Sequence, residues 1–474
     1  MLTKRYLTYF FLVFVFLFCI GSLKANQETT TPNKKLILSM EDCVKLALEN
    51  NEKLKGMGLA IQAAENQRKE ANAAFWPIFE YEYRVAPVPT DATRAFDSFF
   101  EGQLAFFNSI RFKTIVPLFA SGQMRTAEKL ANGGVIAANE NKIKEQEDVT
   151  YQVTQLYYGI LLASELDSLL LDSIKKIDTK LKEEEAKETP DYSPIELLKL
   201  KVFKIDLEKR LAETNQNRDL AKEGLKIQIG AGPEDEIELI SKSLKPEVVN
   251  LASMEEYLNA SLEHRPEFNL LNIGVETKKM QYKLEKMKLG PKAGAAFFID
   301  VGRTHREIKN LGMKDDYNDP FNYSRAGVGI QISGTLDFHG ALARIKKTKA
   351  EYFKAVWDKE IASKGLQLEL KKSFLIAKND KENVTRAKKA ESLAHQMLFL
   401  SKSNFDIGIG EKNDYTEALQ LVLVTRGQYY KAVFDYNVAL ADLQQKVGWI
   451  NYEHLTKHPN IPEYEFFNYD EEVE

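Results

Sequence analysis

Cysteine is scarce in this chain of 474 residues. Only Cys19 and Cys43 occur, which excludes a scaffold held by several disulfides and a multi-cysteine zinc or iron–sulfur site. Proline is also rare, with 14 residues, and charged residues make up 28%, so a largely disordered chain is not expected. The net charge is only −4, from 65 basic and 69 acidic residues, so the sequence predicts no nucleic-acid partner.

Sequence signals of catalysis are missing as well. Neither a nucleophile elbow nor a phosphate-binding loop occurs. His454 and His458 are four residues apart, as two ligands on one helix face would be, but no third ligand accompanies them. The glutamate that a zinc protease carries between such histidines is absent. We therefore expect a protein that is not an enzyme and has neither a metal site nor a cofactor.

The start of the chain predicts export. Lys4 and Arg5 precede a run over residues 6–20 that is apolar apart from Thr8, and small or polar residues follow it. This layout is typical of a secretory signal peptide, which we place at residues 1–25. The run is shorter than the ~20 apolar residues that a membrane-spanning helix needs, and no later run is long enough either.

An internal repeat divides the rest of the chain. The motif Ser-Met-Glu-Asp at 39–42 recurs as Ser-Met-Glu-Glu at 253–256, an offset of 214 residues. A period above 200 residues is far too long for a solenoid unit. Two structurally similar halves, at 26–250 and 251–448, are the simpler interpretation, and residues 449–474 then form an acidic tail.

Each half contains two predicted strands in which apolar and polar side chains alternate. The strands are expected at about 77–87, 103–117, 294–303 and 323–337, each with one apolar and one polar face. The polar face of the first pair carries charged residues, which become candidate lumen-facing residues if the strands surround a channel. They are Glu80, Glu82, Arg84, Arg111 and Lys113.

Long helices follow each pair of strands. Apolar residues recur at helical spacing over 121–184 and again over 341–403, and shorter helices are expected at 194–229 and 413–447. At 1.5 Å per residue, the first long helix would extend about 96 Å. The fold class predicted is therefore mainly α with a small β part, in a two-fold repeat of helix, two strands, long helix and helix.

Strands of about ten residues with aromatic residues on one face are typical of outer-membrane barrels. Four strands cannot close a barrel, and open strand edges are not tolerated in lipid, so several copies would have to pool their strands. The alternative is a periplasmic coiled-coil adaptor or scaffold whose strands form a soluble domain. That domain would need a separate apolar partner for its aromatic face.

The sequence resembles the TolC-like outer-membrane efflux proteins. The resemblance rests on residues 38–51, on Pro117-Leu118-Phe119 with Gly122, and on the stretch 405–448. It implies a homotrimer with a twelve-stranded barrel in outer-membrane lipid, continued by an α-helical barrel in the periplasm. It also implies an exit duct for a tripartite efflux or type I secretion system, with a periplasmic adaptor and an inner-membrane transporter as partners.

Two acidic residues are candidates for the periplasmic aperture of such a channel. Asp414 and Glu417 lie three apart at a helix start, and three copies would surround a narrow opening with six carboxylates, which favours cations. Gly122 and Gly340, like Gly230 and Gly448, recur at an offset of 218 residues, and this offset makes Glu196 and Lys199 the counterparts of the two acids. The alternative is that these acids only complement the helix dipole, at about 0.3–1 kcal/mol each.

The turn beside these acids is a candidate contact for the adaptor. Gly408 and Gly410 would let the backbone turn tightly there, and Pro194 begins the corresponding helix of the first half. An ordinary helix–helix turn explains the same residues equally well.

Overall fold

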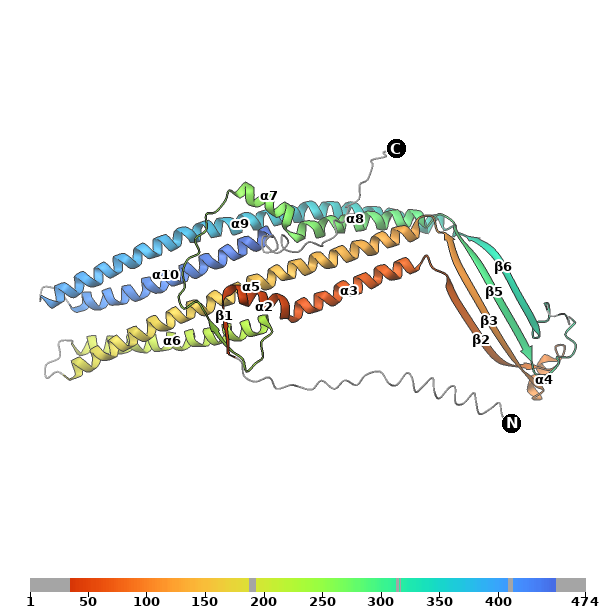
Figure 1. The fold of residues 1–474 in the computed structure, drawn as a ribbon, viewed down its shortest axis with the longest axis horizontal. Coiled ribbons are helices and arrows are strands. Elements are labelled where there is room, and N and C mark those ends of the chain that lie inside the picture. Colours follow the sequence, from red (N-terminus) through yellow and green to blue (C-terminus); the bar gives the residue numbers. More distant parts are fainter. Residues whose placement is uncertain (1–34, 187–192, 313–314, 316, 408–411, 449–474) are drawn as a thin grey trace.

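The computed structural model describes residues 35–186, 193–312, 315, 317–407 and 412–448. The molecule is elongated, with long helices over most of its length and a curved sheet at one end (Figure 1). The predicted signal peptide at 1–25, the acidic tail at 449–474, and Gly408 and Gly410 lie outside the described residues.

The elements follow one another in the same order in the two halves, apart from three short additions in the first half. The first half contains β1 (Lys35–Leu38), α2 (Met40–Asn50), α3 (Glu52–Ala73), β2 (Ile78–Pro89), α4 (Ala95–Phe100), β3 (Leu104–Phe119), α5 (Gln123–Glu185), α6 (Pro194–Ile229) and β4 (Glu236–Leu239). The second half contains α7 (Met254–His264), α8 (Pro266–Met287), β5 (Lys292–Thr304), β6 (Tyr323–Ser333), α9 (Phe338–Asp406) and α10 (Lys412–Val447).

Capping residues define several helix starts. Ser39 accepts from the Asp42 backbone N–H, and the Asp42 carboxylate accepts in return from the Ser39 N–H, which makes a complete capping box. Ser253 begins α7 by accepting from the Glu256 N–H. Asp337 caps α9 through the Gly340 N–H at 2.9 Å. The strand β6 ends at Ser333, four residues before its expected end at 337.

The four long strands form one antiparallel sheet in the order β2-β3-β5-β6, so β2 and β6 are its edges. A second, two-stranded parallel sheet pairs β1 with β4, and the sequence did not predict it. The helix α4 lies within the connection between β2 and β3, at the end of the sheet farthest from the helices (Figure 1).

The long helices form a layer that we call the helical wall. Next to the sheet, its order is α3-α5-α8-α9, and farther away it is α6-α5-α10-α9. Near its middle, a cluster of buried side chains joins α5, α9 and α10, including Val153, Leu370 and Val433. The hairpins α5–α6 and α9–α10 end side by side at the pole opposite the sheet (Figure 1). We call these ends the tips.

The connection between the halves, residues 240–252, crosses the wall as a belt and is held by hydrogen bonds. Asn437 of α10 is 1% exposed. Its amide donates to the Lys245 carbonyl at 2.8 Å and accepts from the Glu247 N–H at 3.0 Å. The Tyr158 hydroxyl of α5 donates to the Glu247 carboxylate at 2.7 Å, and burial together with this bond raises the pKa of Tyr158. The belt therefore fastens α5 to α10.

Candidate functional site

The strand register gathers the predicted lumen-facing residues on one face of the sheet, which we call the polar face. Glu80 is the direct partner of Lys113, and Glu82 is the partner of Arg111. Because directly paired residues of neighbouring strands point to the same face, these four side chains lie together. Arg84 lies on the same strand face, two residues beyond Glu82.

The polar face also carries charges that the list of candidates missed. Across the sheet, Arg111 is the partner of Asp300, and Asp300 is the partner of Arg325. With Glu82, these residues form a row of four alternating charges, one from each strand. In the sequence, the alternation of apolar and polar residues already indicates that Asp300 and Arg325 lie on the polar face. Their alignment with Glu82 depends on the pairing of strands that are distant in the sequence.

Three ion pairs lie on the polar face, one of them within this row. The Arg111 guanidinium donates from Nε to Asp300 Oδ2 at 2.9 Å, and Asp300 is 3% exposed. Arg84 Nη2 lies 2.7 Å from Glu82 Oε1, and Lys113 Nζ lies 3.7 Å from Glu80 Oε2. The charges of the polar face are therefore largely neutralised within one chain.

The opposite face of the sheet, which we call the apolar face, is open. Tyr81 and Val328 are each 79% exposed, and further large side chains on this face are exposed with them. They include Phe79, Tyr83, Phe106, Ile110, Phe112, Ile330 and Ile332. A sheet in water packs its apolar face on a core and leaves its polar face solvated. Here the large apolar side chains are the exposed ones, and Asp300 on the other face is buried.

The helix starts at the tips hold the candidate aperture residues. Pro194 is the first residue of α6, and Ser193 caps it by accepting from the Glu196 N–H at 3.3 Å. The Glu196 carboxylate accepts in turn from the Ser193 N–H at 2.7 Å. This capping box gives Glu196 a local role, and the spacing Ser-x-x-Glu could have predicted it.

Asp414 and Glu417 lie in the first turns of α10 and are exposed. Beside them, Tyr415 and Thr416 line a cavity of about 440 Å³ with residues of α5. The basic residues among these are Lys175, Lys176 and Lys180. Asp172 and Glu183 line the same cavity and pair with Lys176 and Lys180, so this part of α5 carries charges of both signs.

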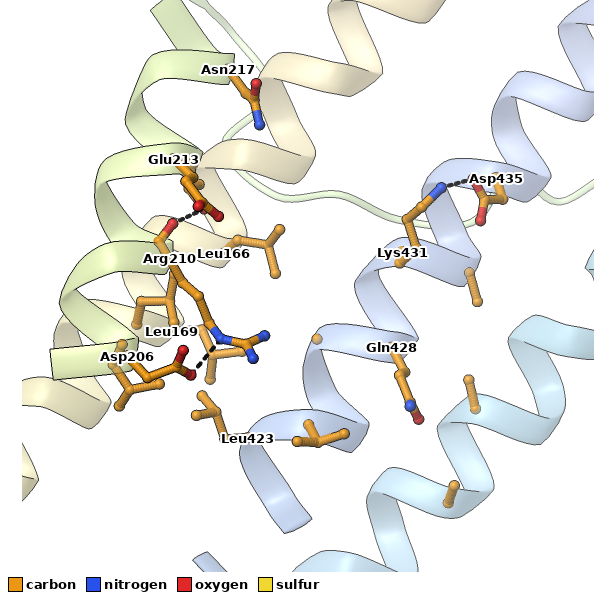
Figure 2. A pocket seen from close by; sticks show the side chains of 18 of the residues that line it. Leu166, Leu169, Asp206, Arg210, Glu213, Asn217, Leu423, Gln428, Lys431 and Asp435 are labelled. Atoms are coloured by element: carbon orange, nitrogen blue, oxygen red, sulfur yellow. Dashed lines mark hydrogen bonds and ion pairs between the residues drawn. The ribbon is translucent and has the colours of Figure 1, made fainter. Parts of the chain in front are cut away.

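A groove of about 880 Å³ runs between the hairpins α5–α6 and α9–α10 (Figure 2). Leucines such as Leu166 and Leu423 line it between charged rims. Arg210 donates to Asp206 at 2.8 Å on one rim, and Lys431 pairs with Asp435 on the other. These charges pair within their own helices. The groove is therefore a packing boundary between the two hairpins and has no excess of one sign of charge.

No helix among the described residues is both long and apolar enough to cross a membrane. Comparison with protein-family models finds no match to this sequence, and comparison with curated proteins finds none either.

Solved structures, in contrast, match along most of the chain. The CmeC outer-membrane channel of Campylobacter jejuni has a TM-score of 0.71 at 16% identity, covering 92% of this chain and 94% of that one. The MtrE outer-membrane channel of Neisseria gonorrhoeae, in its open state, has a TM-score of 0.71 at 14% identity, covering 90% and 95%. The outer-membrane protein VceC of Vibrio cholerae has a TM-score of 0.69 at 14% identity, covering 86% and 96%.

At these identities the similarity establishes the fold. This chain has the fold of the TolC-like outer-membrane channels, so the resemblance predicted from the sequence is confirmed at that level. The predicted class, mainly helical with a small strand part, is confirmed as well. CmeC and MtrE are themselves outer-membrane channels.

Proposed function

We propose that this protein is a trimeric outer-membrane channel that serves as the passive exit duct of a tripartite efflux pump or a type I secretion system. Three copies would contribute twelve strands to one barrel, and their helical walls would continue it into the periplasm. The proposal includes export through a signal peptide at 1–25 and two structural repeats at 26–250 and 251–448.

The exposed apolar face of the sheet is the observation that carries this proposal. Side chains such as Tyr81, Phe112 and Val328 have no covering element among the described residues. Strands that alternate apolar-out and polar-in, with aromatic residues outside, suit a barrel wall between lipid and an aqueous lumen. The charged polar face, with Glu80, Glu82, Arg84, Arg111 and Lys113, would then line the lumen.

The free edges of the layer support self-association in a ring. The sheet ends at β2 on one side and at β6 on the other. In the part of the chain that the structure describes, the helical wall ends at α3 or α6 on one side and at α9 on the other. Two different edges along the whole length suit a head-to-tail contact between copies, which closes into a ring when the rotation allows.

The outer side of α9 gives that contact an apolar surface. An exposed stripe follows the helix at spacings of four and seven residues, and it consists of Phe353, Trp357, Ile361, Leu368 and Leu375. Such a stripe is the pattern of a helix that packs along a neighbouring helix. We infer that it packs on the α3 or α6 edge of the next copy.

The tips would face the periplasm in this arrangement. Asp414 and Glu417, with Glu196 from the first half, are our candidates for an aperture that favours cations. The turn at Gly408 and Gly410 and the start of α6 at Pro194 are our candidates for the adaptor contact. The inner-membrane transporter would act through that adaptor, and the duct itself would need no cofactor.

Native mass tests this proposal. We expect mature protein extracted from membranes to need detergent and to have the mass of three protomers by light scattering, after correction for bound detergent. A monomer that washes off membranes in carbonate and stays soluble without detergent would contradict the proposal. It would instead support a periplasmic coiled-coil adaptor or scaffold.

A further inference from the structure

We propose that the channel has a second constriction at its outer end, formed where the described residues of the connection between β5 and β6, 305–312 and 317–322, fold over the polar face and are fastened there by Arg325. This inference rests on the proposed function, because it takes the polar face as the lumen. The constriction lies at the opposite pole of the molecule from the tips.

A small apolar cluster shows where the connection lies. Val88 of β2, Ala105 of β3 and Ile308 of the connection are buried together, with Ala105 at 0% and Ile308 at 3% exposure. Phe107, Leu311 and Phe321 pack around them. The Phe107 and Phe321 rings meet edge to face, with centroids 5.8 Å apart. The connection therefore packs directly on the strands.

Strand parity tells which face it covers. Ala105 is the direct partner of Val88, and Phe107 and Ser109 follow Ala105 at intervals of two. Arg111 and the lumen-facing candidates come next in the same alternation, so the cluster lies on the polar face. The connection thus covers the side of the sheet that would face the lumen, whereas on the apolar face His305 contacts Phe106 at the strand end.

Arg325 holds the connection in this position. Its Nε donates to the Tyr317 carbonyl at 2.7 Å and its Nη2 donates to the Asp319 carbonyl at 3.2 Å. The guanidinium also lies over the Tyr323 ring, 4.3 Å from its centroid. Hydrogen bonds from a charged group are stronger than neutral ones, so this one side chain has a large share in fixing the connection.

The connection between β2 and β3 is fastened to the same structure. The Lys309 N–H donates to the Thr90 carbonyl at 2.8 Å, and the Ala92 N–H donates to the Lys309 carbonyl at 3.1 Å. The Asn310 amide donates to Asp91 at 3.1 Å. Both connections therefore form one unit. Three such units around a barrel would narrow its outer mouth.

Labelling of intact cells tests the inference. In the mature full-length protein, Lys113→Cys places a thiol on the polar face inward of the connection, and Glu101→Cys places one in the outer connection between β2 and β3. The probe is a membrane-impermeant maleimide that carries a bulky polymer. The remaining cysteine, Cys43, is buried, and burial raises its pKa to about 12, so it stays protonated and unreactive.

We expect Glu101→Cys to react readily and Lys113→Cys to react slowly. Adding Arg325→Gln should speed labelling of Lys113→Cys by about tenfold, the factor expected when a charge-assisted hydrogen bond no longer holds the connection. Adding Lys292→Gln, which removes a positive charge from the far end of β5, should leave that rate unchanged. Ile308→Ser, which opens the apolar cluster, serves as a second releasing variant if Arg325→Gln fails to assemble.

If both cysteines are labelled equally rapidly while Arg325 and Ile308 are unchanged, the proposal of a constriction is overturned. Unchanged slow labelling of Lys113→Cys in both releasing variants would overturn it as well. Failure of the proposed function would look different, because Glu101→Cys would then be inaccessible from outside and the protein would lack the mass of a trimer.

Discussion

The helical wall and the sheet differ in the exposure of their large apolar side chains. In the wall, Val153, Leu370 and Val433 are fully buried, as in a protein folded in water. In the sheet, Tyr81 is among the most exposed side chains while Asp300 on the polar face is buried. The helical wall therefore suits an aqueous environment, and the apolar face of the sheet suits a non-aqueous one. The wall forms much of its own core, whereas the apolar face of the sheet needs a non-aqueous partner.

A cavity in the wall should have the largest effect on stability. Leu370 is fully buried in the central cluster, so Leu370→Ala should lower the free energy of unfolding by about 2–5 kcal/mol. Denaturant unfolding of the detergent-solubilised protein, followed by far-UV circular dichroism, measures this. The control is Gln367→Ala on the same helix, at an exposed position outside the apolar stripe of α9. Equal losses at both positions would contradict the placement of Leu370 in the core.

A charge on the apolar face of the sheet should have the next largest effect. Phe112→Lys should destabilise the membrane-embedded protein by about 2–4 kcal/mol if the site lies near the bilayer midplane, because a lipid-facing position then receives a cation. The loss of stability is measured as a lower temperature at which the assembled protein dissociates on gels. Lys113→Gln, one residue along on the polar face, is the control. If the two variants behave alike, the apolar face does not face lipid.

The two halves differ in their first helix cap, which gives a smaller and more local prediction. Ser39→Ala should cost about 1 kcal/mol, and Ser253→Ala should cost less, because only Ser39 belongs to a complete capping box. Thermal unfolding of the two variants at neutral pH compares them. A larger loss at Ser253 would count against the reciprocal bond as the source of the difference.

The same box has a pH signature. Hydrogen bonds from Ser39 lower the pKa of Asp42 below its ordinary value of 3.8. Its contribution to stability is therefore present above pH 3.8 and is lost as the pH falls through the lowered pKa of the folded state. Asp42→Asn, which removes the titrating carboxyl, should flatten that part of the stability profile between roughly pH 5 and pH 2. If the variant loses stability at low pH just as the original protein does, Asp42 does not contribute to that loss.

Removing the tip acids should have the smallest energetic effect. Asp414→Ala combined with Glu417→Ala should lower the cation-to-anion permeability ratio in planar bilayers by on the order of twofold, since rings of carboxylates favour cations. Glu196→Ala should mainly remove a helix cap. Unchanged selectivity in the double variant would leave the acids with a dipole role only.

The sequence predicted the elements whose pattern is local. Alternation assigned Tyr81 and Glu82 to opposite faces, and helical spacing indicated the long helices, because periods of 2 and 3.6 are visible in short windows. The pairing of β1 with β4 was missed, since about 200 residues separate the strands and each has only four. The cover that Ile308 and Phe321 form over the polar face was missed because it depends on tertiary contacts of a loop.

The belt has a mechanical consequence for the tips. Asn437 binds the belt 25 residues from the start of α10, so about 37 Å of helix extends beyond that attachment. If α10 tilts as a rigid body about Asn437, a rotation of about 5° displaces its far end by about 3 Å, roughly the width of a water molecule. A small rotation at Asn437 would thus produce a larger displacement at the start of α10, where the proposed aperture lies.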